Sequence, residues 1–392
     1  MQLKKELSDR KKPFFCPDAT RGVLRGLDSQ DLLATGTKTL IVNTLHLAEK
    51  PGEDYLRKIG GVKKLMNWPG QIISDSGGFQ LFSMFHRKPG LGKIVDEGLK
   101  IYTGPKRQRF NIFTPEKSIA TQFALGSDMM VCLDDFTPPQ PDNERLEKSV
   151  WRTIDWAKRS RAEFEKRWAE KVKEAKKSGA EIELEKPQLL AVLQGHPSQK
   201  WRRYCAEELI KIGFDGFGLG GWLINPDDGK LDLEAVAFNT TLMPESSWRY
   251  AMGVGKAEDI ATLFALGYTI FDCVIPTRDA RHGRISVFRR EKITELMGFL
   301  AGRVAGAENL EAVKKADVLR EAFDYIYIDK GQWATDERPL DEKCQCHTCQ
   351  HYSRAYLHHL YQIKDVSFSR LATIHNLYFY QELMRLLGES QE

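Results

Sequence analysis

The sequence lacks the features that would direct a protein into a membrane or out of the cell. The 392-residue chain has no uninterrupted apolar run of about 18 residues, the minimum for a membrane-spanning helix. Residues 1–10 are mostly polar and lack the apolar core of a secretory signal. We therefore expect a cytoplasmic protein that has no membrane partner.

The chain also lacks the glycine-rich loops that bind phosphates. No GxGxxG or GxxxxGK[ST] motif follows any strand that we expect, which argues against a dinucleotide or ATP site. Hydrophobic residues make up 42% and charged residues 29% of the chain, a balance typical of a folded protein with a large core. The net charge of +4 permits nucleic-acid binding without requiring it.

The seven cysteines are too unevenly spread for a disulfide framework. Four are isolated, which is typical of small buried apolar side chains. The other three are Cys344, Cys346 and Cys349, and thiolates at this spacing can converge on one tetrahedral zinc ion. A closed structural site needs a fourth ligand, and spacing alone leaves five candidates: His347, His351, His358, His359 and His375.

Short β-rich apolar runs alternate with helical patterns along most of the chain, which favours parallel βα units. The expected strands cover residues 39–43, 71–74, 129–133, 189–193, 214–219, 250–252 and 269–274. Seven or eight such units in about 300 residues predict an α/β fold of the (β/α)8 TIM-barrel type.

Helix signals and the cysteines predict how the rest of the chain is divided. Pro115 and Gly126 bracket a helix over 115–125, as proline at the start and glycine just past the end favour. Residues 295–335 look irregular or helical. We expect residues 1–330 to form the barrel with its insertions, and residues 331–392 to form a zinc-binding subdomain with a C-terminal helix.

Acidic residues lie at the ends of three expected strands: Asp75, Asp134 and Asp272. The C-terminal ends of barrel strands face the active site, so these side chains would line one pocket. Carboxylates there can act as nucleophiles or as general acids and bases. A single aspartate at such a position is more often a helix cap or a turn residue, and the joint placement of the three favours the pocket.

Glycines and apolar side chains occupy neighbouring positions. Gly77-Gly78, Gly195 and Gly220-Gly221 also follow strands, where they can let a ligand approach the backbone or simply form βα turns. Phe79 and Met252 could hold a planar ring between them, or could belong to the core.

Six basic residues lie between positions 278 and 292: Arg278, Arg281, Arg284, Arg289, Arg290 and Lys292. Such a cluster is either a solvated face or a contact for nucleic-acid phosphates. Composition alone does not distinguish the two.

Several longer motifs resemble the tRNA-guanine transglycosylases, or queuine tRNA-ribosyltransferases, of the bacterial type. They occur in the order of that family between about residues 20 and 385. The motifs are Asp75–Gln80, Leu193–Gly195, Gly218–Gly221, Met252–Gly255, Phe271–Arg278, Cys344–Cys349, Ser353–Leu357 and Ile374–Leu377.

The resemblance implies a TIM barrel with a zinc subdomain that acts on tRNAs carrying a GUN anticodon. The enzyme would replace the wobble guanine with a 7-deazaguanine, preQ1 or queuine, and would work as a homodimer. Asp272 would be the nucleophile that forms a covalent bond to ribose, and Asp75 would handle the proton on the bases. The implied base contacts are Ser76, Phe79, Asp134, Gln194, Gly221 and Met252; the implied tRNA contacts are Arg278 and Arg281; the implied zinc ligands are Cys344, Cys346, Cys349 and His375.

The chain departs from the family pattern at two places. Asp135-Phe136 stands where Glu-Cys is common, and Trp222–Pro226 replaces a loop that ends in a glutamate. Asp227 or Asp228 could supply that carboxylate, and the identity of the base stays open between preQ1 and queuine. A non-catalytic tRNA-binding paralogue is one alternative, although retention of both Asp75 and Asp272 argues against it. A relative that modifies DNA or another tRNA position is a second alternative.

Overall fold

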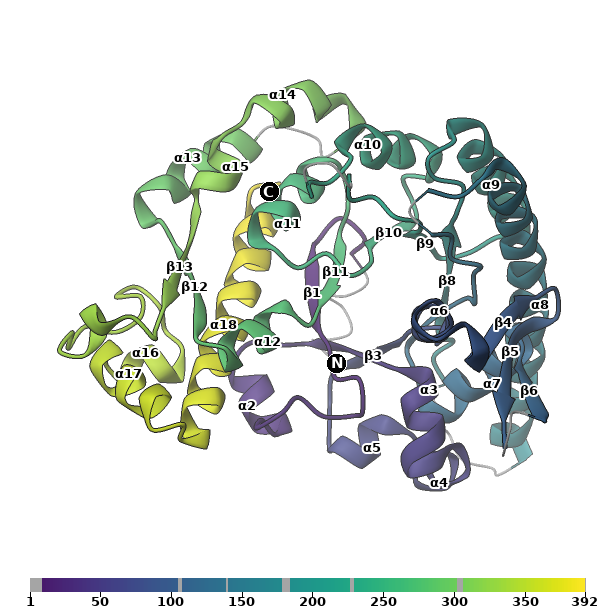
Figure 1. Ribbon diagram of the computed structural model, residues 1–392, viewed down its shortest axis with the longest axis horizontal. Helices are drawn as coiled ribbons and strands as arrows, with labels where there is room; N and C mark the ends of the chain where they lie inside the picture. Colours follow the sequence, from purple (N-terminus) through teal and green to yellow (C-terminus); the bar gives the residue numbers. More distant parts are fainter. Residues whose placement is uncertain are drawn as a thin grey trace.

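The computed structural model describes residues 9–391 apart from 105–107, 139, 178–183, 226–228 and 302–305. Over these residues, eight parallel strands form one sheet in the order β1-β11-β10-β9-β8-β7-β3-β2 (Figure 1). The strands are β1 (Phe14–Pro17), β2 (Thr39–Val42), β3 (Gln71–Ser74), β7 (Met129–Val131), β8 (Gln188–Leu193), β9 (Gly216–Leu219), β10 (Trp248–Ala251) and β11 (Ile270–Cys273). The predicted α/β barrel is confirmed.

The sheet closes between its first two strands. Asp18 and Ile41 form a parallel bridge, and the Ala19 N–H donates to the Ile41 carbonyl at 2.8 Å. We did not predict β1 as a strand, because an apolar run this short resembles the buried part of any element. Alternate residues of the strands point inward and pack together: Phe14, Cys16, Ile41, Ile73, Met129, Val131, Leu190, Val192, Trp248, Tyr250 and Ile270.

Helices surround the barrel and connect its strands. The predicted helix over 115–125 is confirmed with the same bounds; the Thr114 hydroxyl caps its start, and Gly126 ends it in the left-handed region. The helices between strands are α2 (Ser29–Ala34), α3 (Thr44–Leu47), α4 (Glu53–Ile59), α5 (Val62–Met66), α6 (Gly78–Arg87), α7 (Pro115–Leu125), α8 (Asn143–Lys177), α9 (Gln199–Ile212), α10 (Leu233–Leu242) and α11 (Ala257–Ala265). The helices that come after the last barrel strand, β11, are α12 (Ile275–Arg281), α13 (Arg290–Leu300), α14 (Leu310–Lys315), α15 (Val318–Glu321), α16 (His347–His351), α17 (Arg354–Gln362) and α18 (Val366–Glu389).

Two small antiparallel sheets are added to the barrel. One contains β4 (Gly92–Val95), β5 (Gly98–Thr103) and β6 (Arg109–Phe113), and the other pairs β12 (Arg284–Phe288) with β13 (Phe323–Tyr327). The prediction for residues 295–335 was therefore incomplete: α13–α15 are helical, but β13 is a strand. Its partner lies more than 30 residues earlier in the chain, and local patterning does not reveal a pairing over that separation.

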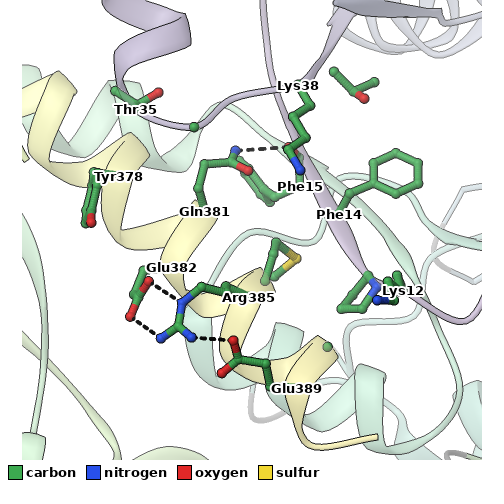
Figure 2. Close-up of a pocket in the computed structure, with 15 residues that line it drawn as sticks. Lys12, Phe14, Phe15, Thr35, Lys38, Tyr378, Gln381, Glu382, Arg385 and Glu389 are labelled. Atoms are coloured by element: carbon green, nitrogen blue, oxygen red, sulfur yellow. Dashed lines mark hydrogen bonds and ion pairs between the residues drawn. The ribbon is translucent and has the colours of Figure 1, made fainter. Parts of the chain in front are cut away.

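The C-terminal helix α18 joins the barrel to the cysteine region. It packs on β1 and α12 and also contacts β12, α16 and α17 (Figure 1). A cavity of about 450 Å³ lies beside it at the N-terminal ends of β1 and β2. In that cavity Arg385 is neutralised by Glu382 and Glu389, as Figure 2 shows. This end of the barrel is opposite to the acidic strand ends. Among the residues that the structure describes, every helix is either too short or too polar to span a bilayer.

Candidate active site and metal centre

The residues that the sequence indicated as a site lie at the C-terminal ends of six barrel strands. Asp75, Ser76 and Phe79 follow β3; Asp134 follows β7; Gln194 follows β8; Gly221 follows β9; Met252 follows β10; and Asp272 is the next-to-last residue of β11. In a TIM barrel these ends meet at one mouth. The fold therefore places all eight positions at the same mouth of the barrel.

Asp75 is held by four hydrogen bonds from the surrounding loops. The amides of Thr44 and Gly77 both donate to Oδ1 at 3.0 Å. The side chains of Asn43 and Gln80 donate to Oδ2 at 2.7 and 3.0 Å. Burial raises the pKa of Asp75 to about 6 even though these donors favour the charged form. A carboxyl with this pKa can both accept and return a proton near neutral pH.

Asp272 has a different environment on β11. The Tyr250 hydroxyl and the Gly253 amide both donate to Oδ1, at 2.8 and 2.7 Å. Gly253 has a φ of +73°, which favours glycine and turns its N–H toward the carboxylate. Burial raises the pKa of Asp272 to about 6, against the two hydrogen bonds, and the charge of Asp18 raises it further. The side chain is therefore largely ionised at neutral pH.

Asp134 and Gln194 form a polar pair between Asp75 and the β9 loop. The Gln194 amide donates to Asp134 Oδ2 at 2.7 Å, while its buried Oε1 has no partner among the described residues. Gly221, with a φ of +88°, lies so that an added Cβ would be 3.7 Å from this Oε1. Burial raises the pKa of Asp134 to about 6, and Asp135 adds to the rise. Together these groups offer donors and acceptors to a flat polar edge.

Two apolar side chains, those of Phe79 and Met252, also follow barrel strands at this end of the sheet. Phe79 is 50% exposed, and its ring meets the edge of Phe136 at a centroid distance of 5.2 Å. Met252 lies where a side chain on Gly218 would be, because an added Cβ there would come within 2.7 Å of the Met252 sulfur. An exposed aromatic face and a polarizable thioether suit the faces of a planar ligand.

The structure accounts for the two residues that depart from the family pattern after Asp134. Asp135 is fully buried and forms ion pairs with Arg145 and Arg152, which compensate its charge. Phe136 packs on Phe79 and on Phe82. Asp135 is therefore structural, whereas Phe136 contacts the exposed ring at the site.

The altered loop after β9 is described only in part. Trp222 is 39% and Ile224 45% exposed, and Ile224 bridges to Leu231. Pro226, Asp227 and Asp228 lie outside the described residues, so the predicted carboxylate is not placed.

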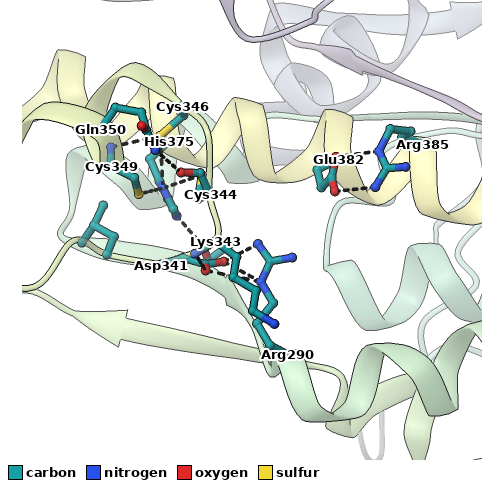
Figure 3. A network of polar contacts seen from close by, with 12 residues as sticks. Arg290, Asp341, Lys343, Cys344, Cys346, Cys349, Gln350, His375, Glu382 and Arg385 are labelled. Atoms are coloured by element: carbon teal, nitrogen blue, oxygen red, sulfur yellow. Dashed lines mark hydrogen bonds and ion pairs between the residues drawn. The ribbon is translucent and has the colours of Figure 1, made fainter.

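The cysteine cluster and one of the five candidate histidines form a buried group. The ligand atoms of Cys344, Cys346, Cys349 and His375 all lie within 4.8 Å of one another, and His375 Nδ1 is 3.2–3.8 Å from the three sulfurs. Zinc bonds of about 2.0–2.3 Å in a tetrahedron produce edges of about 3.5 Å, so the four donors fit a metal ion. Figure 3 shows their convergence.

A second contact fixes how His375 presents its ring. Its Nε2 lies 2.9 Å from the Ser286 carbonyl of β12, so this nitrogen donates and leaves the Nδ1 lone pair toward the thiols. Arg290 and Asp341, paired at 2.6 Å, connect α13 to the loop before Cys344 (Figure 3). The cluster thus links α18 to the segments that follow the barrel.

Asn376, next to His375 on α18, extends this link to the active-site side. Its Nδ2 donates to the Pro276 carbonyl of α12 at 3.0 Å, and its Oδ1 accepts from the Ser286 amide at 3.0 Å. Because α12 follows Asp272 closely in the chain, Asn376 connects the segment around the Cys344, Cys346, Cys349 and His375 cluster to the helix at the mouth of the barrel.

Most of the basic cluster is neutralised within the fold. Arg284, Arg289, Arg290 and Lys292 pair with Asp279, Asp324, Asp341 and Glu321. Arg278 is 3.5 Å from Asp279 and 52% exposed, and Arg281 forms no ion pair among the described residues. Burial, and then Arg25 and Arg278, lower the pKa of Arg281. Arg25 and Arg278 thus act on Arg281 as like charges, and a gathering of positive charges favours an anionic partner.

Sequence reasoning missed the residues that hold the two carboxylates and one of the arginines. Asn43 and Thr44 follow β2, so the rule that identified Asp75 could have found them. Tyr250 reads as an ordinary strand residue, and nothing local shows that its hydroxyl reaches Asp272. Arg25 follows β1, a strand that we did not predict.

Comparison with known proteins agrees with this site. A family model described as queuine tRNA-ribosyltransferase matches residues 2–390. The chain is 34% identical over 380 residues to the queuine tRNA-ribosyltransferase of Mannheimia succiniciproducens, covering 97% of this chain and 86% of that protein. It is 33% identical over 393 residues to that of Aliivibrio fischeri strain MJ11, covering 100% and 89%, and 34% identical over 379 residues to that of Caldanaerobacter subterraneus, covering 96% and 86%. The chain therefore belongs to the queuine tRNA-ribosyltransferase family.

Proposed function

We propose that this protein is a tRNA-guanine transglycosylase that exchanges guanine for a 7-deazaguanine at the wobble position of GUN-anticodon tRNAs. The observation that carries the proposal is the pair of half-buried carboxyls, Asp75 and Asp272, at one mouth of the barrel with polar and aromatic side chains around them. Family membership over nearly the whole chain supports it.

The two carboxylates would have separate roles. Asp272 would attack ribose C1′ and form an Asp–ribose bond as the bond from C1′ to guanine N9 breaks. Guanine would leave with a proton from Asp75. The incoming base would return that proton to Asp75, and its N9 would displace Asp272 from C1′. One glycosidic bond replaces another, so no ATP is required.

The remaining site residues would bind the base and the tRNA. Ser76, Asp134, Gln194 and Gly221 would read the polar edge of the base, with Phe79 and Met252 on its faces. Arg278 and Arg281, joined by Arg25, would contact phosphates of the anticodon loop. Phosphate contacts suit these side chains because few carboxylates oppose them.

The base, the metal and the assembly are further parts of the proposal. We propose preQ1 or queuine as the incoming base; a cavity of about 600 Å³ lined by His196, Trp222 and Ile224 adjoins Gly221 and has room for a large substituent. The metal would be a structural Zn²⁺, in keeping with its three thiol ligands. A cytoplasmic homodimer is expected by resemblance to the bacterial relatives. The division of the chain at residue 330 stays a prediction.

Exchange of labelled guanine tests the proposed activity. The purified protein should incorporate labelled guanine into a GUN-anticodon tRNA and should not label the same tRNA with adenine at the wobble position. Competition by preQ1 and by queuine then identifies the base. Binding of tRNA without incorporation would instead favour a non-catalytic paralogue. Labelling of DNA would favour a relative that modifies DNA.

Phe136 should influence base binding more than chemistry. Replacing it with cysteine, the residue common in the family, removes the ring that contacts Phe79 at 5.2 Å. Aromatic pairs contribute about 0.5–1.5 kcal/mol, so KM for the base should rise by about two- to tenfold while kcat stays nearly unchanged. Steady-state kinetics with saturating tRNA measures both values.

A matched control for this substitution is Phe123→Cys. It breaks a ring pair with Phe164, at 5.5 Å, between α7 and α8, and should leave KM for the base unaltered. An equal rise of KM in both variants would contradict a role for Phe136 at the site.

A further inference from the structure

The environment of Asp272 distinguishes its two oxygens. The Tyr250 hydroxyl and the Gly253 amide both donate to Oδ1. Among the described residues, no hydrogen bond reaches Oδ2. An oxygen that accepts two hydrogen bonds is a poorer nucleophile than one that accepts none, because its lone pairs are engaged.

Tyr250 is fixed in place by the barrel itself. It is fully buried and points inward from β10, among the side chains that fill the barrel. Tyr250 pairs in register with Ile270 on the neighbouring strand, so Asp272 lies one inward-facing position further along β11. The tyrosine side chain is long enough for its hydroxyl to reach the Asp272 carboxylate from β10. Burial raises the pKa of Tyr250 well above its ordinary value, and the charge of Asp272 adds to the rise, so the hydroxyl remains a donor at working pH.

We propose that Tyr250 is a positioning residue for the reaction: with the Gly253 amide it holds Oδ1 of Asp272, so that Oδ2 is the atom that bonds to ribose C1′. The inference rests on the proposed function and deepens it. One oxygen forms the C1′–O bond while the electrons of the C1′–N9 bond leave with guanine. The end of β10 thus supplies both the orientation of the nucleophile and, through Met252, one wall of the base site.

Other titratable groups lie near Asp272 or Tyr250 without donating a hydrogen bond to the carboxylate. Cys16 pairs with it in register on β1, and Asp18 at the end of that strand raises its pKa. Cys273 is its neighbour on β11, and Asp75 acts electrostatically on Tyr250 from the β3 loop. Among the described residues, Tyr250 is the only side chain that donates a hydrogen bond to the Asp272 carboxylate.

Tyr250→Phe removes the hydroxyl and keeps the ring. A hydrogen bond to a charged group corresponds to about a 10- to 100-fold effect, so kcat should fall by that factor while KM for the base changes little. The acidic limb of the pH–kcat profile should move to higher pH, because the lost donor favoured the ionised form. The matched control is Tyr268→Phe, a buried tyrosine whose hydroxyl donates to the Val236 carbonyl at 3.2 Å; its pH profile should not move.

A second measurement does not depend on activity. The difference between the thermal midpoints of the unaltered protein and Asp272→Asn grows with pH and levels off near the folded-state pKa of Asp272. In a Tyr250→Phe background the difference should level off at a higher pH and be larger at pH 8. If the unaltered protein shows no base exchange, the proposed function fails, yet this stability titration still tests Tyr250. Unchanged kcat, together with a midpoint difference that levels off at the same pH and has the same size at pH 8 in Tyr250→Phe, would overturn the inference.

Discussion

Asp272→Asn should abolish base exchange, with a loss of at least about 10⁴-fold in kcat, the size of effect seen when a nucleophile is removed from an enzyme site. Asparagine has nearly the shape of aspartate but cannot form the ester bond to ribose. Incorporation of labelled guanine into tRNA measures the loss. A gel that retains a denaturation-resistant protein–tRNA band with the unaltered protein, and none with the variant, would show the covalent step directly.

The same variant should remain folded, because the Tyr250 hydroxyl and the Gly253 amide both donate to Oδ1, which asparagine keeps. The pKa of Asp272 is about 6 in the folded chain, above the ordinary 3.8, so its contribution to stability is present at low pH and is lost as the pH rises through about 6. Asparagine has no such loss. The thermal midpoint of Asp272→Asn should therefore exceed that of the unaltered protein at pH 8 and approach it near about pH 4.

Activity that survives in Asp272→Asn would contradict its assignment as the nucleophile. Asp75→Asn should be measured beside Asp272→Asn, because it removes the proposed proton carrier and keeps the proposed nucleophile. It should still form the tRNA adduct to some extent while turnover falls.

His375→Ala should remove the metal and lower the free energy of unfolding by about 4 kcal/mol or more, because loss of a metal site is among the largest effects of a single substitution. The substitution removes the Nδ1 ligand and the contact with the Ser286 carbonyl. Metal analysis should find stoichiometric zinc in the unaltered protein and a deficit in the variant, and thermal unfolding should occur earlier.

The control for this prediction is His359→Ala on α17, which changes an exposed histidine of the same region. It should keep its zinc and its unfolding midpoint. Because Asn376 ties α18 to α12, His375→Ala should also weaken tRNA binding through Arg278 and Arg281. Full zinc content in His375→Ala would contradict its assignment as a ligand.

Local patterns in the sequence determined the fold class and the general nature of the site. Alternating strand and helix signals indicated the barrel, and the position of Asp75, Asp134 and Asp272 at the ends of β-rich runs indicated that they share one mouth. These inferences succeed because the directions of strands and the positions of their ends follow from short stretches of chain. The spacing of Cys344, Cys346 and Cys349 indicated a metal in the same way.

Only the tertiary structure decided which distant groups meet. The spacing of the cysteines left five histidines as candidates for the fourth metal ligand, and the family resemblance indicated His375. The fold brings His375 to the three thiols. In the sequence, the six basic residues between positions 278 and 292 form a single cluster. In the fold, ion pairs neutralise four of them, so that chiefly Arg278 and Arg281 can contact an anionic partner. Tyr250 reaches Asp272 from the next strand, and β12 pairs with β13 across a long insertion. Such contacts depend on how strands and helices pack in three dimensions, and residues far apart in the chain carry no local signal of it.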